Sequence, residues 1–317
     1  MATRSKRITM YDAEKLKLIN PESLKMIHKY KQDMSIRELS PKTVYNYLTD
    51  LNQWLIYVYD NQFNQSVLEL NEDDITEFIY WCKIQGNNTE RIKRRMSSIS
   101  AFYIYLHKKR LIKENPMTFI DRPKKGSPVV TQTFLTLEQV ELMKQKLQEH
   151  GDLQLQTYAL FSLSTMARVN AVANLKWEQV DLERRTCTNV LEKEGKLVDL
   201  FFSEEVRDLL IAIKEKRANE GIDDHGWVFT TPQATATTPI QNSTLNEWCK
   251  KIGAMINVPT LHCHDFRHSG ATLLKNLGMP LEDVSALLNH SGTDVTRKFY
   301  IKEDTSRLSA AKDRFKI

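Results

Sequence analysis

The sequence predicts a mainly α-helical protein with two domains, the second of which also contains a small β-hairpin. Its 317 residues exceed the usual length of one domain. Apolar residues recur at helical spacing through most of the chain, whereas residues 114–133 hold three prolines and no such period. With 41% hydrophobic residues and a mean hydropathy of −0.46, the composition is that of a soluble globular protein.

A helical bundle is expected in the first half of the chain. Four helices are predicted at residues 21–34, 40–60, 71–84 and 87–111. Ser40 and Pro41 are a strong start signal, because serine caps a first turn and proline suits the first helical position. Three aromatic residues of the fourth helix are expected in the core: Phe102, Tyr103 and Tyr105. We therefore expect an N-terminal extension over 1–20, a bundle over 21–113 and a basic linker over 114–133.

Positive charge is concentrated in this first part. Residues 1–130 carry 22 Lys and Arg against 15 Asp and Glu, and residues 91–125 carry 11 basic against 2 acidic side chains. Such a stripe attracts DNA or RNA, because phosphate contacts release counterions. A charge run is also typical of a solvated helix face, and that alternative stays open. The residues expected to contact phosphates are Arg91, Lys93, Arg94, Arg95, Lys124 and Lys125.

The second domain, over 134–317, is expected to combine helices with one hairpin. Helical segments are predicted at residues 136–150, 153–177 and 203–217, with further helices towards the C-terminus. Residues 185–202 are typical of two strands joined by a tight turn at Glu194-Gly195. Ser203 is expected to cap the next helix, and residues 305–317 to form a short tail helix.

Several classes of protein are disfavoured. The chain has no run of about eighteen apolar residues and no apolar signal core near its start, so no membrane partner is expected. Cys82, Cys187, Cys249 and Cys263 show no CxxC spacing, which favours reduced thiols in a cytoplasmic protein. Because no glycine-rich phosphate-binding pattern is present, no cofactor is predicted.

The segment HCHDFRH at residues 262–268 contains three histidines, a cysteine and an arginine. Histidine and cysteine are metal ligands, but the spacing matches no HExxH or zinc-finger pattern, and Arg267 would repel a cation. We therefore expect no metal. His262 and His268 are expected to be satisfied by local hydrogen bonds at a helix start. His264 and Arg267 lie three positions apart and share one face of a helix.

The surrounding sequence places further groups in a definite order. After H-x-x-R-H come an apolar helix and His290, and Tyr300 lies ten residues later. Upstream, the segment STMARVNAVANLKW contains Arg168 before a short helix that ends in Leu-Lys-Trp. In these boxes the chain resembles the tyrosine recombinase (phage integrase) family over residues 21–317. The resemblance implies a SAM-like core-binding domain, an α+β catalytic domain, and a catalytic lysine in the β-turn of the hairpin, Lys193.

The resemblance also implies a catalytic set, namely Arg168, Lys193, His264, Arg267, His290 and the nucleophile Tyr300. The two arginines stay charged and can pair with the non-bridging phosphate oxygens, so charge stabilisation requires no metal ion. A phenol with a pKa of about 10 needs a base or a positive field, which His264 and the arginines can provide. The lysine would protonate the 5′ oxygen, and His290 would bond the phosphate. A covalent phosphotyrosine conserves the bond energy, so rejoining requires no ATP.

Two positions of the site leave questions open. Lys193 and Lys196 face opposite sides of an extended chain, so only one should reach the phosphate. Lys193 fits the position before the turn, and Lys196 is interpreted as a solvated strand residue. Ala171 stands where the family often has an acid, which leaves the support of Arg168 open. Asn289 replaces the glycine before the third histidine, and asparagine tolerates the positive φ that such a turn needs.

The predicted function is site-specific recombination in a phage or mobile element. The enzyme would cut and rejoin duplex DNA through a 3′-phosphotyrosine and a Holliday junction. The expected partners are double-stranded DNA, further copies of the chain in a tetramer on DNA, and an accessory directionality factor. Two alternatives stay open: a DNA-binding repressor on the same scaffold, and a type IB topoisomerase-like enzyme. The intact catalytic set argues against the repressor.

Overall fold

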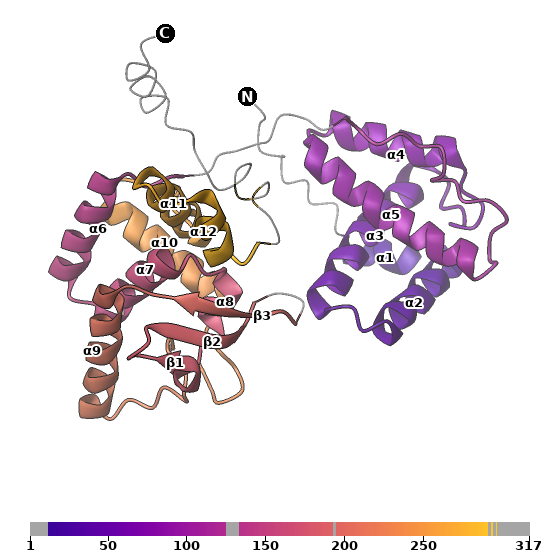
Figure 1. Cartoon of the computed structure of the whole chain (residues 1–317). Coiled ribbons are helices and arrows are strands. Elements are labelled where there is room, and N and C mark those ends of the chain that lie inside the picture. Colours follow the sequence, from indigo (N-terminus) through magenta and orange to yellow (C-terminus); the bar gives the residue numbers. More distant parts are fainter. Residues whose placement is uncertain (1–11, 125–132, 193–194, 291–292, 294–295, 297–317) are drawn as a thin grey trace, which may run out of the picture. The chain divides into compact units, whose positions relative to one another are not determined.

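The structure, a computed structural model, describes residues 12–124, 133–192, 195–290, 293 and 296 of the chain. The chain divides into two compact units, Met1–Val130 and Thr131–Ile317 (Figure 1). The described residues are mainly helical with a small three-stranded sheet, which confirms the predicted fold class. Within these residues, no helix is both long and apolar enough to cross a membrane.

The first unit is a helical bundle whose described helices begin at polar caps. They are α1 (Ala13–Leu18), α2 (Pro21–Ile36), α3 (Pro41–Asn61), α4 (Glu72–Ile84) and α5 (Thr89–Lys108). The cap side chains accept backbone N–H groups of the first turn, and they are Asp12, Asn20, Ser40, Asn71 and Asn88. The four predicted helices are confirmed. The prediction was incomplete for the N-terminal extension, which contains α1, because a helix of six residues is too short for a periodic signal.

Aromatic side chains fill the core of this bundle. Trp54 of α3 lies 6.4 Å from Phe102 and 5.7 Å from Tyr103 of α5, measured between ring centroids. The ring of Tyr30 of α2 lies 5.4 Å from that of Phe102. Phe102, Tyr103 and Tyr105 are all buried, so these rings pack the interior as predicted. Aromatic contacts of this kind join α2, α3 and α5 into one unit.

The second unit places helices around a small antiparallel sheet (Figure 1). Its described helices are α6 (Leu137–His150), α7 (Leu153–Thr165), α8 (Val169–Ala173), α9 (Glu204–Glu220), α10 (Asn242–Met255), α11 (Cys263–Asn276) and α12 (Leu281–Leu287). The sheet has the order β1 (Val180–Asp181), β2 (Thr186–Leu191) and β3 (Leu197–Phe201). The predicted hairpin is β2 and β3. The two-residue strand β1 is an addition that no periodicity could reveal.

The segment predicted as helical over 153–177 consists of two helices with a turn between them. Helix α7 ends at Thr165, and Met166 then adopts a left-handed backbone conformation with φ of 53°. Arg168 is extended at the N-cap of α8, with φ of −71° and ψ of 148°. The turn therefore directs Arg168 away from the path of α7.

Helix α11 approaches the end of α7 closely because of a glycine. A Cβ atom added at Gly270 would come within 2.5 Å of the carbonyl oxygen of Leu163 and 2.8 Å of a side-chain carbon of Met166. No larger residue fits there without a shift of the backbone. This close approach brings the start of α11, which carries His264 and Arg267, to the turn that precedes Arg168.

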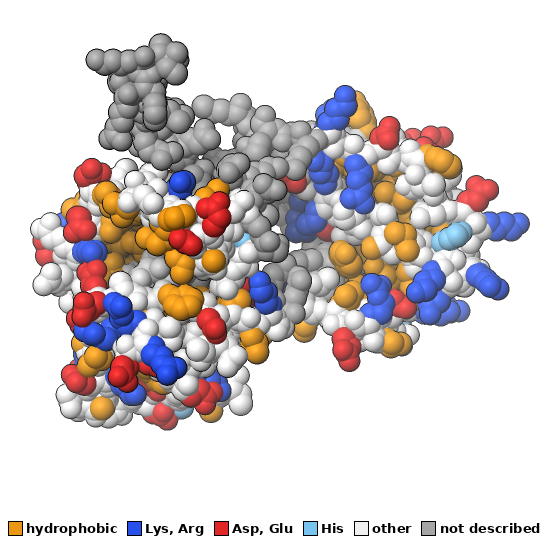
Figure 2. All heavy atoms as spheres, in the orientation of Figure 1, with side chains coloured by type: hydrophobic (Ala, Val, Ile, Leu, Met, Phe, Trp, Pro, Cys, Tyr) orange, Lys and Arg blue, Asp and Glu red, His pale blue; other side chains and the backbone are white. Residues whose placement is uncertain are grey.

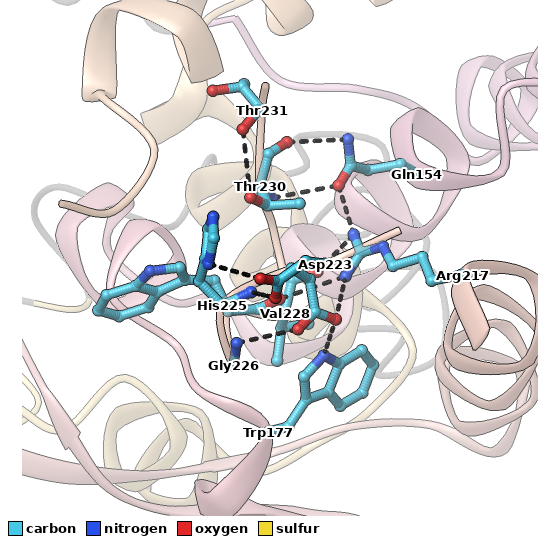
Figure 3. A network of polar contacts seen from close by, with 11 residues as sticks. Gln154, Trp177, Arg217, Asp223, His225, Gly226, Val228, Thr230 and Thr231 are labelled. Carbon is cyan, nitrogen blue, oxygen red and sulfur yellow. Dashed lines mark hydrogen bonds and ion pairs between the residues drawn. The ribbon is translucent and has the colours of Figure 1, made fainter. Parts of the chain in front are cut away.

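A buried arginine, Arg217, joins three segments of the second unit (Figure 3). Arg217 of α9 donates to the carboxylate of Asp224 at 3.0 Å and to the carbonyl oxygens of Trp227 and Val228 at 3.2 and 3.0 Å. It also donates to the side-chain oxygen of Gln154 on α7. A buried guanidinium is stable only when its donors are paired. This network fixes α9 against α7, and α7 in turn supports the candidate site.

Candidate active site

Arg267 is almost fully buried, with 1% of its surface exposed. Its Nη1 donates to the carbonyl oxygen of Met166 at 2.6 Å, and its Nη2 donates to the carbonyl oxygen of Leu288 at 2.7 Å. Nη2 also lies 3.1 Å from Nε2 of His290. The guanidinium of Arg267 therefore connects the end of α7, helix α11 and the end of α12.

Arg168 and Arg267 share one acidic neighbour, Glu192, at the end of β2. Nη1 of Arg168 donates to Oε2 of Glu192. Oε1 of the same carboxylate lies 4.0 Å from Nη1 of Arg267. The side chain of Glu192 is 2% exposed and that of Arg168 is 28% exposed. One buried carboxylate thus faces both predicted catalytic arginines, and Arg168 keeps part of its surface open to solvent.

His290 is neutral at pH 7, and its contacts define its tautomer. Burial and then the charges of Arg267, Arg168 and Lys196 lower its pKa to about 4. Because Arg267 can only donate, Nε2 of His290 accepts, and the ring proton lies on Nδ1. Nδ1 lies 2.8 Å from Oγ1 of Thr296 and donates to it. His290 therefore orients the guanidinium of Arg267 through a defined ring nitrogen.

The surroundings of His264 also favour its neutral form. Its side chain is exposed, but the atoms packed around the ring partly desolvate it, and this desolvation lowers its pKa. The charges of His262, Arg267 and Arg168 lower the pKa further. A neutral imidazole near two guanidiniums can accept a proton at pH 7.

The other two histidines of HCHDFRH lie in different surroundings. Nδ1 of His262 lies 2.9 Å from Oδ2 of Asp265, and this bond raises the pKa of His262. Asp265 in turn accepts the backbone N–H of His262 at 2.9 Å, as in a capping box. His268 is buried with its ring 6.0 Å from that of Phe134, and burial lowers its pKa to about 4. As expected, His262 is satisfied locally.

Of the two candidate lysines, the structure describes only Lys196. Its ammonium donates to the carbonyl oxygen of Asn289 at 2.9 Å. Lys196 is exposed, in agreement with its interpretation as a solvated residue, and it lies directly before β3. Its ammonium nevertheless lies beside the loop of His290. Lys193 and the predicted nucleophile Tyr300 lie outside the described residues.

Asn289 supports the turn that carries His290. Its φ is 55°, the left-handed value that asparagine was predicted to tolerate in place of glycine. Its side-chain amide donates to the carbonyl oxygen of Asp199 on β3 at 3.3 Å. With the bond from Lys196, the hairpin therefore holds this loop at two points, which a glycine at position 289 would reduce to one.

Three contributors to the site escape prediction from sequence: Glu192, Thr296 and the carbonyl groups that Arg267 binds. A signal for Glu192 was present. Side chains alternate along a strand, so the buried Val190 places residue 192 inward as well. A carboxylate at an inward position indicates a buried partner. No local signal exists for Thr296 or for the carbonyl groups.

The predicted DNA-binding residues of α5 occupy different environments. Arg94 donates through Nε and Nη2 to both oxygens of the buried Asp50, at 3.0 and 2.7 Å. Arg91 lies 3.7 Å from the same carboxylate. Arg95 is 2% exposed and donates to Gln53 at 2.6 Å inside the bundle. Its guanidinium is directed into the bundle core and not towards the surface of the unit, so the expectation of a phosphate contact does not fit Arg95.

The remaining predicted residues are lysines in three different situations. Lys93 pairs with Glu90 at 3.4 Å, and Lys124 is exposed at the end of the described part of the first unit. Lys125 lies outside the described residues. Figure 2 shows Lys and Arg side chains at several places on one face of this unit, with acidic side chains between them.

Each of the two units matches a known protein-family model. The model of the Phage integrase family matches residues 133–307, and that of the Phage integrase, N-terminal SAM-like domain matches residues 27–110. The chain is 28% identical over 286 residues to tyrosine recombinase XerC of Pediococcus pentosaceus, covering 86% of this chain and 92% of that protein. It is 25% identical over 283 residues to tyrosine recombinase XerD of Oceanobacillus iheyensis, with coverages of 83% and 88%.

Solved structures share the fold. XerH site-specific recombinase bound to a palindromic difH substrate superposes with a TM-score of 0.72 at 18% identity, covering 92% of this chain and 84% of that one. A lambda integrase (75–356) dimer bound to a COC′ core site gives a TM-score of 0.68 at 14% identity, with coverages of 88% and 97%. The two family models and the relatives together show that the chain belongs to the phage integrase family of tyrosine recombinases.

Proposed function

We propose that this chain is a site-specific recombinase that cuts and rejoins duplex DNA through a 3′-phosphotyrosine and a Holliday junction. The observation that carries the proposal is the meeting of Arg168 and Arg267 at one buried carboxylate, with His290 in contact with Arg267, from separate parts of the second unit. A structural ion pair would need only one arginine. Two guanidiniums at one place suit a phosphodiester, which has two non-bridging oxygens.

The arginines stabilise the charge that the phosphoryl group gains in the transition state. Arg267 is held by two backbone carbonyl groups and His290, so it reorganises little when the substrate binds. Arg168 is partly exposed and has donors available to an incoming phosphate. Two guanidiniums can supply the positive charge that a metal ion would otherwise provide, so we propose cleavage without a metal. The covalent phosphotyrosine conserves the bond energy, so we propose rejoining without ATP.

Tyr300 is the proposed nucleophile. Its phenolic oxygen attacks the phosphorus atom, a P–O bond to tyrosine forms, and the bond from phosphorus to the 5′ oxygen breaks. The lowered pKa of His264 favours the neutral imidazole, which is the form that can accept the phenolic proton. The 5′ oxygen leaves with a proton from a lysine of the hairpin, for which we propose Lys193. Attack of a 5′ hydroxyl on the phosphotyrosine reverses these steps and releases Tyr300.

His290 has a narrower role than a phosphate ligand in the DNA-free state. Its Nε2 accepts from Arg267, so it stabilises the orientation of that guanidinium. A hydrogen bond from His290 to the phosphate stays a prediction for the DNA complex. Duplex DNA contacts by the basic residues of α5 and the linker, and a tetramer on two DNA sites, are parts of the same proposal.

Formation of a covalent adduct tests this function. The chain would first select its site from a random duplex library by mobility shift, and a nicked suicide duplex would then carry the selected sequence. With EDTA present and ATP absent, we expect an SDS-resistant protein–DNA adduct that maps to Tyr300. Specific binding with no adduct would favour the repressor. Relaxation of supercoiled plasmid without a selected site would favour the topoisomerase.

A further inference from the structure

Glu192 is an acid in an unusual position. Its side chain is 2% exposed, at the end of a strand whose other inward residues are apolar. A carboxylate so deeply buried is costly unless charged groups compensate it. Its two oxygens face different arginines: Oε2 accepts from Arg168, and Oε1 lies 4.0 Å from Arg267. Among the described residues, Oε1 itself accepts no hydrogen bond.

The backbone around Glu192 is fixed as firmly as its side chain. Its N–H donates to the carbonyl oxygen of Lys196 at 2.9 Å, which closes the hairpin next to Lys193. A shift of the hairpin would therefore move the carboxylate. Conversely, the ion pair with Arg168 holds the hairpin against the turn before α8.

Arg168 depends on this carboxylate for its orientation. Its backbone is set at the start of α8, where its carbonyl oxygen accepts from the N–H groups of Ala171 and Val172 at 2.8 and 3.2 Å. Among the described residues, Glu192 is the one hydrogen-bond partner that the guanidinium of Arg168 has. Ala171 is fully buried and has no acid to offer. The carboxylate that supports Arg168 therefore comes from β2 instead of α8.

We propose that Glu192 is a positioning residue of the recombination reaction, a role that rests on the function proposed above. It holds Arg168 and Arg267 so that both can bind one phosphodiester. Two neighbouring guanidiniums repel each other, and a negative charge between them offsets that repulsion before DNA arrives. The same charge opposes the incoming phosphate. Removing it should therefore leave DNA affinity unchanged or increase it, while the cleavage rate falls because Arg168 loses its orientation.

The test measures affinity and rate separately on the nicked suicide duplex. For Glu192→Gln we expect single-turnover adduct formation at saturating enzyme to fall about 10- to 100-fold, the usual effect of losing a group that orients a functional side chain. The dissociation constant should stay within about 3-fold or decrease. Glu192→Asp keeps the charge on a shorter side chain and should recover part of the rate. Asp181→Asn on β1, whose carboxylate accepts from the N–H of Arg184, is the matched control and should cleave normally.

A second comparison asks whether Glu192 acts through Arg168. In the Arg168→Ala background, Glu192→Gln should cause little further loss of rate, since the arginine that it orients is gone. Equal losses in both backgrounds would overturn the proposal. A wild-type cleavage rate in Glu192→Gln would also overturn it. So would Glu192→Gln and Glu192→Asp variants that cleave equally slowly and have equally reduced melting temperatures, because that result indicates a structural defect. Failure of the recombinase function would look different: the wild-type chain would then bind the selected duplex but form no adduct. The Glu192 variants are compared only if the wild-type chain does form the adduct.

Discussion

Nη2 of Arg267 lies 3.1 Å from Nε2 of His290, although the two residues are separated by a helix, a turn and a second helix. The contact requires a neutral histidine, because a protonated ring would have no lone pair to offer. The pKa of His290, lowered to about 4 by burial and neighbouring charges, satisfies that requirement at physiological pH. The charge of Arg267 and the protonation state of His290 are therefore linked. The guanidinium of Arg267 is already oriented by His290 before a phosphate binds.

The nucleophile is tested by Tyr300→Phe. Removing one hydroxyl should leave affinity for the selected duplex unchanged and abolish the covalent adduct, because no other group takes over the attack. Mobility shift and SDS gels measure the two quantities. An adduct that persists, or that maps to another tyrosine, would show that the assignment is wrong.

The general acid is tested with Lys193→Ala. Loss of proton transfer should slow cleavage about 10²- to 10⁴-fold on ordinary DNA. A substrate with a bridging 5′ sulfur leaves as a thiolate and needs no proton, so its cleavage should be nearly normal in the variant. The same substrate should not rescue Arg168→Ala, whose loss concerns the non-bridging oxygens.

Lys196→Ala is the matched control for this experiment. Its ammonium binds the carbonyl oxygen of Asn289, so we expect a modest loss of rate that the sulfur substrate does not rescue. Rescue of Lys196→Ala in place of Lys193→Ala would identify Lys196 as the acid.

Contacts of the first unit with the DNA backbone are tested by salt dependence. Replacing Lys93, Lys124 and Lys125 by glutamine should weaken binding to all sequences and reduce the slope of log K against log salt by about one unit per lost contact. Arg94 is left intact because it pairs with the buried Asp50. Lys146→Gln, which removes a surface pair with Glu149, serves as the control. An unchanged slope in the triple variant would mean that these lysines are solvated surface residues that do not contact the DNA backbone.

Buried histidine makes stability depend on pH in a definite direction. The pKa of His268 is about 4 in the folded chain, below the usual value of about 6.5, because of burial. Between these values the unfolded chain binds more protons, so the free energy of unfolding should fall as pH is lowered from 6.5 to 4. Above pH 7 this contribution is fully present. His290 acts in the same direction.

Melting temperature against pH measures this effect. His268→Gln should flatten the decline between pH 6.5 and 4 by roughly 2–3 kcal/mol of unfolding free energy at most. His28→Gln, at an exposed position on α2, should leave the curve as it is. A curve for His268→Gln that parallels the wild type would contradict the assigned protonation.

The Arg217 network predicts a purely structural defect. Arg217→Ala leaves Asp224 without its cation and two carbonyl groups without their donor, so we expect a loss of about 3–5 kcal/mol in unfolding free energy. Arg207→Ala on the same helix removes only surface pairs and should change stability little. Urea unfolding measures both. Equal stabilities of the two variants would refute the importance of the network in Figure 3.

Much of the fold was predictable because its signals are local. Helix caps such as Ser40 and Thr136 act within four residues, and apolar periodicity acts within one helix. Short elements gave no signal: α1 and β1 contain six and two residues. The prediction that Arg95 contacts phosphates was wrong, because a run of basic residues does not reveal which of them face the bundle core.

The sequence by itself determined which chemical groups the chain carries and in what order: two arginines, two histidines, hairpin lysines and a tyrosine in the boxes of one family. Only the tertiary structure decided how Arg267 is held, by carbonyl groups of residues 166 and 288, and that Glu192 stands between the arginines. The reason is physical. Capping and periodicity are interactions between near neighbours, whereas the direction of a carbonyl group and the partner of a buried charge follow from the packing of α7, α11, α12 and β2.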